Sequence, residues 1–451
     1  MKKIITYVLV AVLSLVFSAA PIFAGGSDIP VIVAEGAILI DAKTGTVLYS
    51  KNSDAQFEPA STTKMMTCIL ALENLDLDEV VVIDAETPFT EGSRVYLEEG
   101  ERITVNQLLH ALMLESANDA AVALAKRISG TTEDFAKLMN EKAKEIGATN
   151  TNFVNPNGLH IEGHLTTPHD LAMIAKYAMQ NKTFRELVTT YKYDIPATNM
   201  KEERHLYNTN RLLYDEKTKV DVNGIQRTAK YEGVTGIKTG YTSHAGGCLV
   251  SGAERNGTEL IAVVLKSTDK DRFGDSIALL DYGFANYYSA HPVAKGDVVT
   301  TAEVSRGKVK EIDVKAAEDV YITLPAEASA DMLSTEAKLN EDIVAPLKKG
   351  DKIGTLEVKH EGDLVAEVPL VAAQSVESGS LLALLGMDDL QVKKFYITFA
   401  VIFVIIINIF FIYLALKRRG IRRRKALRQQ RAMEIVMERR RRESEQRRWP
   451  Y

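Results

Sequence analysis

Cysteine is nearly absent from this sequence, and no long internal repeat runs through it. Two cysteines, Cys68 and Cys248, are too few to build a disulfide-stabilised scaffold in a chain of 451 residues. We expect two buried free thiols, with a single bridge between them as the alternative.

Basic residues are also scarce in the segment 25–416, which holds 38 Lys and Arg against 56 Asp and Glu. This acidic balance argues against nucleic acid as a partner of that part of the chain.

Both ends of the chain carry segments typical of export and membrane attachment. Residues 1–24 contain two lysines, an apolar run and then small residues, which is the layout of a cleaved signal peptide. An uncleaved anchor helix is the alternative. Residues 395–416 form an uncharged run of 22 residues, and a helix needs about 20 to cross the hydrocarbon core of a bilayer. The sequence therefore predicts an exported protein with one transmembrane helix.

The charge on the two sides of this helix predicts its orientation. Lys393 and Lys394 precede it, whereas the segment 417–451 holds 15 Lys and Arg against 4 Asp and Glu. The more basic side is expected to be cytoplasmic, which places residues 25–394 outside the cytoplasm. Anionic lipid or RNA would also suit the arginines of the tail. A topology signal followed by a solvated helix is the simpler interpretation.

Hydrophobic periodicity divides the exported part into an α/β domain and a smaller β-rich domain. Residues 25–290 start with β-type runs, continue through helical stretches and return to β-type runs around an Asn-Gly turn. This order predicts an antiparallel sheet flanked by helices, with a helical subdomain. Residues 291–372 alternate in short runs that predict an all-β domain. Residues 373–394 are expected to be a juxtamembrane spacer.

Three short motifs of serine acyl-transfer enzymes occur here, each more than once. Ser-x-x-Lys occurs three times, and Ser-x-Asn and Lys-Thr-Gly occur twice each. A single copy is therefore weak evidence. The copies are Ser61…Lys64, Ser267…Lys270, Ser305…Lys308, Ser50…Asn52, Ser116…Asn118, Lys43-Thr44-Gly45 and Lys238-Thr239-Gly240.

Order and local context select one copy of each motif. Ser61 and Lys64 start a predicted helix, and Ser116 and Asn118 lie in a polar break between two helical stretches. Lys238 begins a β-type run. The remaining copies lie at hairpin tips, at strand ends or in the β-rich domain, and we interpret them as ordinary surface residues.

The first Lys-Thr-Gly is the clearest of the rejected copies. It follows Asp41 in a turn between two β-type runs, which predicts a hairpin. Gly45 supplies the turn geometry, and Lys43 and Thr44 are expected at a solvated tip. Only Lys238-Thr239-Gly240 is therefore expected to line a site.

The selected residue types suit nucleophilic attack on a carbonyl carbon. A serine hydroxyl is a poor nucleophile until a base takes its proton. Ser61 and Lys64 are three residues apart on a helix, so the amine can reach the hydroxyl. Lys64 must be neutral to act as that base, and burial beside a second cation such as Lys238 favours the neutral form. Ser116 would relay a proton to the leaving amine, and Asn118 would hold a substrate amide.

The β-type run completes the expected site. Lys238 and Thr239 would meet a substrate carboxylate, and Gly240 leaves room for the substrate backbone beside the strand. Ser61, at a helix N-terminus, can also offer its backbone N–H to an oxyanion. This chemistry needs no cofactor and no metal.

With these motifs the chain resembles the low-molecular-mass penicillin-binding proteins, the serine-type D-alanyl-D-alanine carboxypeptidases of the D-Ala-D-Ala carboxypeptidase A family. The matching stretches are "EPASTTKMMT", "SANDAA", "NPNGL" and "GIKTGYT". The resemblance covers roughly residues 30–290, and residues 292–372 resemble the usual C-terminal domain of the family. It implies a β-lactamase/transpeptidase-like α/β fold.

The resemblance also implies roles for individual residues. Ser61 would carry the acyl group, Lys64 would accept its proton, and Ser116 would be the second active serine. The backbone N–H groups of Ser61 and Tyr241 would form the oxyanion hole. The substrate would be the peptidoglycan stem pentapeptide, which loses its terminal D-Ala, and β-lactams would be inhibitors. Arg211 is a candidate for a further basic residue of the family, although its register leaves that role open.

Three alternative functions fit parts of the pattern. A class A β-lactamase needs a glutamate, usually in Glu-x-x-Leu-Asn, between the Ser-x-Asn and the Lys-Thr-Gly. The match at Glu336–Asn340 follows the Lys-Thr-Gly, so a penicilloyl ester should persist. A D,D-endopeptidase that cuts cross-links is chemically close and stays open. A non-catalytic wall-binding module would make Ser61→Ala silent.

Three histidines lie close together in the sequence, at His160, His164 and His169. Their spacing fits no common pair of zinc ligands on a helix, and zinc would need further ligands. We interpret them as loop histidines.

Overall fold

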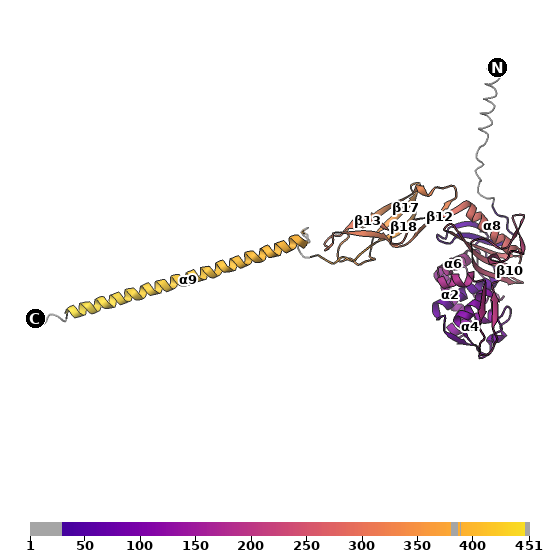
Figure 1. The fold of residues 1–451 in the computed structure, drawn as a ribbon, viewed down its shortest axis with the longest axis horizontal. Coiled ribbons are helices and arrows are strands. Elements are labelled where there is room, and N and C mark those ends of the chain that lie inside the picture. Colours follow the sequence, from indigo (N-terminus) through magenta and orange to yellow (C-terminus); the bar gives the residue numbers. More distant parts are fainter. Residues whose placement is uncertain (1–28, 380–386, 388, 447–451) are drawn as a thin grey trace, which may run out of the picture. The chain divides into compact units, whose positions relative to one another are not determined.

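The computed structural model describes residues 29–379, 387 and 389–446, so the predicted signal peptide lies outside the described residues (Figure 1). The chain forms two compact units. Among the described residues, the first contains the chain from 29 to 294 together with Asp319–Thr335 and Val358–Ala366, and the second contains Lys295–Glu318, Glu336–Glu357 and the described residues from Glu367 onward.

A five-stranded antiparallel sheet is the centre of the first unit, as predicted. Its strand order is β2-β1-β11-β10-β9. The Asn256-Gly257 turn joins β10 to β11, and both residues have the positive φ that a tight hairpin turn requires. The strands are β1 (Gly36–Asp41), β2 (Val47–Lys51), β9 (Val234–Thr242), β10 (Gly246–Arg255) and β11 (Thr258–Ser267).

The sheet is buried on both faces, because its apolar side chains alternate between two cores. On β1, Ile38 and Ile40 enter one core, and Leu39 between them enters the other. Helix α8 (Asp271–Asn286) contributes Phe273 and Ile277 to the second core. The first core holds the helical subdomain, which consists of α2 (Lys64–Asn74), α3 (Val105–Leu114), α4 (Asn118–Ser129), α5 (Thr132–Ile146), α6 (Pro168–Ala178) and α7 (Lys182–Thr189).

Short strands and turns complete this unit. The paired strands are β3 (Val80–Val82) with β4 (Arg102–Thr104), β5 (Lys192–Ile195) with β6 (Arg204–Tyr207), β7 (Lys219–Val222) with β8 (Ile225–Thr228), and β12 (Tyr287–Val293) with β15 (Val320–Pro325). The 3-10 turns are η1 (Ala60–Thr63), η2 (Thr87–Phe89), η3 (Arg211–Leu213) and η4 (Ala330–Met332).

The turn of the β1–β2 hairpin is anchored through Asp41, while Lys43 is exposed, in agreement with the predicted solvated tip, and Thr44 is half-buried. Asp41 is fully buried, and its Oδ1 accepts a hydrogen bond from the backbone N–H of Lys43 at 2.8 Å. Its Oδ2 accepts hydrogen bonds from the hydroxyls of Ser289 and Thr323. Lys43 Nζ lies 3.3 Å from a carboxylate oxygen of the buried Glu259. The partners come from β11, β12 and β15, which are remote in sequence, so the hairpin pattern alone does not reveal them.

The second unit contains most of a five-stranded antiparallel sheet, consistent with the predicted all-β domain. Its strand order is β13-β14-β18-β17-β16. The alternation of buried and exposed residues along β14 shows one covered face and one solvated face. The strands are β13 (Val298–Glu303), β14 (Glu311–Ala316), β16 (Leu333–Leu339), β17 (Lys352–His360) and β18 (Asp363–Ala372).

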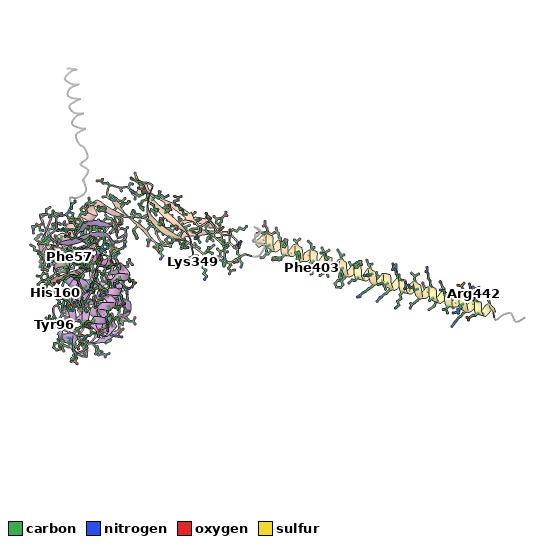
Figure 2. All side chains as sticks on the ribbon, turned by 180° about the vertical axis from the view of Figure 1, so that it is seen from behind. Phe57, Tyr96, His160, Lys349, Phe403 and Arg442 are labelled. Atoms are coloured by element: carbon green, nitrogen blue, oxygen red, sulfur yellow. The ribbon has the colours of Figure 1, made fainter. Side chains whose placement is uncertain are left out.

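The predicted transmembrane segment and the described part of the basic tail belong to one unbroken helix, α9 (Asp389–Gln446; Figure 1). The helix is long and apolar enough to cross a membrane. Phe403 of the apolar segment and Arg442 of the tail project from the same helix (Figure 2). Arg439, Arg441 and Arg442 each pair with a glutamate four residues away, which is a spacing that supports helix formation.

Candidate active site

Ser61 lies in the 3-10 turn η1, just before the helix on which Lys64 is the first residue. We expected a helix starting at Ser61, so the observed turn is tighter than predicted. The Thr62 hydroxyl donates to the Pro59 carbonyl at 2.7 Å, and the Thr63 hydroxyl donates to the Ala60 carbonyl at 2.8 Å. These side chains occupy carbonyl oxygens that a regular helix would use, and they favour the tighter turn.

Lys64 is the centre of the site, fully buried and within reach of three oxygen atoms. Its Nζ lies 2.9 Å from Ser61 Oγ, 2.7 Å from Asn118 Oδ1 and 2.6 Å from the Asn157 carbonyl oxygen. The amide of Asn118 is fixed in orientation because its Nδ2 donates to the Glu91 carbonyl at 2.7 Å. Asn118 Oδ1 and the Asn157 carbonyl can therefore only accept hydrogen bonds from the amine.

The arrangement serves Lys64 in both protonation states. As an ammonium it donates one N–H to each of the three oxygen atoms, Ser61 Oγ included. As a neutral amine it keeps two N–H groups for the two carbonyl oxygens, and its lone pair then faces the Ser61 hydroxyl. Burial lowers the pKa of Lys64 well below its ordinary value, and the nearby charge of Lys238 lowers it further. The contribution of Asp119 acts in the opposite direction and is smaller. The geometry and the pKa both favour Lys64 as a base toward Ser61.

Ser116 lies in the break between α3 and α4, as predicted. Its φ is +59°, a conformation that non-glycine residues rarely adopt and that often marks functional positions. The Oγ of Ser116 is buried and has no hydrogen-bond partner among the described residues. A buried hydroxyl without a partner is costly in a folded protein, so it is available to a group that enters the site.

The second Lys-Thr-Gly lies inside β9 and not at its start, four residues after Val234. Gly240 approaches the turn of Ser61 so closely that a Cβ added there would lie 3.0 Å from the Ser61 backbone nitrogen. Any side chain at this position would collide with the backbone of the turn that carries Ser61. Thr239 is held by a 2.6 Å hydrogen bond between its hydroxyl and that of Thr209, and the Tyr241 side chain is exposed.

Positive charge gathers beside this strand. Lys238 is buried, and burial followed by the charge of Arg272 lowers its pKa to about 7. Arg272 donates to the Gly240 carbonyl at 2.6 Å and lies 2.7 Å from Asp269. Burial lowers the pKa of Arg272, and the charge of Arg211, whose guanidinium lies 5.7 Å from the Phe273 ring centre, lowers it further. A cluster of Lys238, Arg272 and Arg211 suits an anionic substrate group.

Sequence reasoning missed two contributors, Arg272 and Asn157. Arg272 lies more than thirty residues after the motif that it supports, and no sequence pattern marks it. Asn157 acts through its backbone carbonyl, which no side-chain pattern can reveal. The available signal was the "NPNGL" turn, where Asn155 Oδ1 accepts hydrogen bonds from the backbone N–H groups of Asn157 and Gly158.

The three neighbouring histidines lie in three different environments. His164 is buried, and its Nδ1 accepts a hydrogen bond from the Val154 backbone N–H, so its Nε2–H faces the Thr63 hydroxyl at 2.9 Å. Burial and the charge of Lys64 lower the pKa of His164 to about 4, which keeps it neutral. His160 stacks on His244, and His169 lies beside Asp170.

The cysteines are two buried free thiols, as expected, and Cys248 lies opposite Gly240 in the sheet. Burial raises the pKa of both thiols, that of Cys248 to about 11. Neither is therefore a nucleophile at neutral pH.

The site thus combines a serine with a buried amine beside it, an unpartnered second hydroxyl and a strand with clustered cations. Such a set can transfer an acyl group from a substrate that ends in a carboxylate.

Two family models match this chain. Residues 25–269 match the D-alanyl-D-alanine carboxypeptidase family, and residues 287–378 match the family described as penicillin-binding protein 5, C-terminal domain. Among curated proteins, D-alanyl-D-alanine carboxypeptidase DacF from Bacillus subtilis (strain 168) is 36% identical over 78% of this chain and 88% of the relative. D-alanyl-D-alanine carboxypeptidase DacC from Escherichia coli (strain K12) is 30% identical over 82% and 90%.

Solved structures agree with this similarity. Penicillin-binding protein 5 from Haemophilus influenzae has a TM-score of 0.63 and 28% identity, and the match covers 78% of this chain and all of that structure. PBP3 from Streptococcus pneumoniae, described as a peptidoglycan synthesis regulatory factor, has a TM-score of 0.62 and 26% identity over 77% of this chain. From its motifs, its fold and these similarities, the chain belongs to the D-alanyl-D-alanine carboxypeptidase family.

Proposed function

We propose that this protein is a membrane-anchored, extracytoplasmic carboxypeptidase that removes the terminal D-Ala from peptidoglycan stem pentapeptides through an acyl-enzyme on Ser61. The observation that carries the proposal is the hydrogen-bond pattern of Lys64. Two of its three partners, Asn118 Oδ1 and the Asn157 carbonyl oxygen, can only accept hydrogen bonds and each take one N–H of the amine. The third position on the Lys64 nitrogen faces the Ser61 hydroxyl.

In the first step, Ser61 Oγ attacks the carbonyl carbon of the penultimate D-Ala while Lys64 takes its proton. The backbone N–H groups of Ser61 and Tyr241 receive the negative charge that develops on the carbonyl oxygen. Ser116 passes a proton to the amine of the leaving D-Ala as the C–N bond breaks. An ester on Ser61 remains, and water releases the shortened peptide.

The cations beside β9 select the substrate terminus. Lys238 and Thr239 bind the terminal carboxylate, with Arg272 supplying further positive charge and holding the Gly240 carbonyl. Asn118 binds a substrate amide next to Lys64. A β-lactam carries a similar carboxylate and carbonyl, so it should acylate Ser61 and leave slowly.

We propose that the chain is divided into five parts after the signal peptide. Residues 25–290 are the catalytic domain, residues 291–372 the β-rich domain and residues 373–394 a spacer. Residues 395–416 cross the membrane, and residues 417–451 are the cytoplasmic tail. The basic composition of the tail supports this orientation.

Intact-mass measurements on the full chain in detergent test the proposal. Benzylpenicillin should add its own mass to the protein, and the adduct should persist. Ser61→Ala should abolish the adduct, whereas Ser305→Ala, in a rejected Ser-x-x-Lys copy, should leave it unchanged. Penicillin consumed without an adduct would contradict the proposal and favour a β-lactamase. Penicillin left intact would favour a binding module.

Release of D-Ala then separates the two peptidase activities. A soluble pentapeptide should lose D-Ala with the wild-type chain and not with Ser61→Ala. Cleavage of a cross-linked dimer without D-Ala release from the pentapeptide would instead assign an endopeptidase.

A further inference from the structure

Three side chains that the mechanism does not use meet beside the active site. His160 and His244 stack face to face, with ring centres 3.9 Å apart and planes within 7° of parallel. His160 Nδ1 lies 2.9 Å from Glu58 Oε1. We call these three residues the clasp.

The clasp joins the three segments that build the site. Glu58 lies three residues before Ser61, and His160 lies three residues after Asn157, whose carbonyl accepts from Lys64. His244 lies four residues after Gly240, in the turn between β9 and β10. The nucleophile, the partner of the base and the substrate strand are thus tied together by one set of side-chain contacts.

The position of the clasp along the proposed path of the substrate follows from the direction of β9. The cation cluster at Lys238 marks the end of this path that takes the terminal carboxylate, and Gly240 faces the nitrogen of Ser61. The strand continues past Tyr241 toward His244. The clasp therefore lies beyond the scissile bond, at the end where the acyl part of the substrate leaves the site.

The turn that carries His244 has further anchors of its own. The Lys266 ammonium donates to the His244 carbonyl at 2.5 Å, and the Ala245 N–H donates to the Thr242 hydroxyl at 2.9 Å. These bonds fix the turn to its own sheet. The stack with His160 connects this turn to the residue that directly follows the "NPNGL" segment. The contact between His160 and Glu58 then connects both to the segment of Ser61.

We propose that Glu58, His160 and His244 act as positioning residues that hold the segments on the acyl side of the active site and thereby set the rate at which Ser61 is acylated. The inference rests on the proposed function. Loss of the stack would let the β9–β10 turn and the "NPNGL" segment move apart. Both the Tyr241 N–H and the Asn157 carbonyl would then lose their alignment with Ser61 and Lys64.

The test is the acylation rate of the full chain with benzylpenicillin, followed by intact mass under single-turnover conditions. His160→Ala and His244→Ala should each slow acylation by about three- to tenfold, the range expected for the loss of one aromatic pair. The double variant should be no slower than either single variant, because both remove the same contact. His244→Phe, which keeps a ring for stacking, should restore most of the rate.

The matched control is His291, which also stacks on a ring. Its ring lies 4.4 Å from that of Tyr321, and it contacts Asp319 at 3.2 Å. His291→Ala should leave acylation unchanged. Melting temperatures within a few degrees of the wild type would confirm that the clasp variants are folded.

Several results would overturn the inference. Rates within twofold of wild type in both alanine variants would do so, as would single effects that multiply in the double variant. Failure of His244→Phe to restore the rate in a folded protein would also refute it. Each of these leaves the proposed function intact, whereas an adduct on Ser61→Ala would refute the proposed function itself.

Discussion

The two Lys-Thr-Gly triplets allow a sharp paired test, because the structure gives their lysines opposite environments. Lys238 is buried in β9 among cations, and Lys43 pairs with Glu259 in the turn of the β1–β2 hairpin. We expect Lys238→Ala to lose activity and Lys43→Ala to keep it. Both variants remove the same side chain from the same triplet sequence.

The expected loss for Lys238→Ala follows from the contact that it would make. A hydrogen bond to a charged group is worth about 1.5–3 kcal/mol, which corresponds to about 10- to 150-fold in kcat/KM. A second effect acts in the same direction, because the charge of Lys238 helps to lower the pKa of Lys64. Without Lys238, less of the base is neutral at a given pH.

Lys43→Ala should cost stability and not activity. Glu259 keeps Arg185, whose guanidinium contacts both of its carboxylate oxygens. The Lys43 side chain is 31% exposed, so its ion pair should contribute at most about 1 kcal/mol to the free energy of unfolding. Release of D-Ala from a pentapeptide and urea unfolding measure the two effects separately. An inactive Lys43→Ala beside an active Lys238→Ala would refute the assignment of the two triplets.

Two further predictions concern pH and a close backbone contact. kcat/KM should rise with pH as Lys64 loses its proton and fall above about pH 7 as Lys238 loses its charge. The fall in kcat should come at higher pH, because a bound carboxylate stabilises protonated Lys238. A flat profile of kcat/KM between pH 6 and 9 would contradict this prediction. Because the unfolded chain binds protons that folded Lys238 does not, Lys238 should make the free energy of unfolding rise from about pH 7 to 10.5. Gly158→Ala should abolish acylation, because a Cβ there would lie 1.8 Å from the Ala60 carbonyl oxygen. Gly163→Ala, with a similar positive φ but no contact closer than 3.8 Å, should keep most of it. Equal losses in the two glycine variants would show that backbone strain and not the close contact is responsible.

Much of the fold was predictable because its signals are local. Apolar alternation and an Asn-Gly turn predict β10 and β11, and the helical spacing of Met65, Met66, Ile69 and Leu70 predicts α2, where all four are buried. The motif residues were selected by order and context, and the structure brings Ser61 and Asn118 within hydrogen-bond distance of Lys64, with the charge of Lys238 near enough to lower its pKa.

The parts that could not be predicted depend on contacts between distant segments. The buried environment of Asp41 is formed by Ser289 and Thr323, and no local pattern connects them to the hairpin. The role of Asn157 lies in a backbone carbonyl, and that of Arg272 depends on which strand its helix packs against. In each case the sequence specifies the side chain, and the tertiary fold decides its partner.

The continuity of α9 limits what its tail can touch. Residues 417–446 continue the helix by about 45 Å at 1.5 Å per residue. The arginines at 439–442 therefore stand about 35 Å along the axis from the end of the apolar segment, and even a strong tilt leaves them several Debye lengths from the bilayer. With residues 395–416 in the membrane, as proposed, screening removes lipid head groups as electrostatic partners of these distal arginines as long as the helix stays straight. The first two turns of the tail would then lie at the membrane surface, and the distal arginines would be in the aqueous compartment at a fixed distance from it.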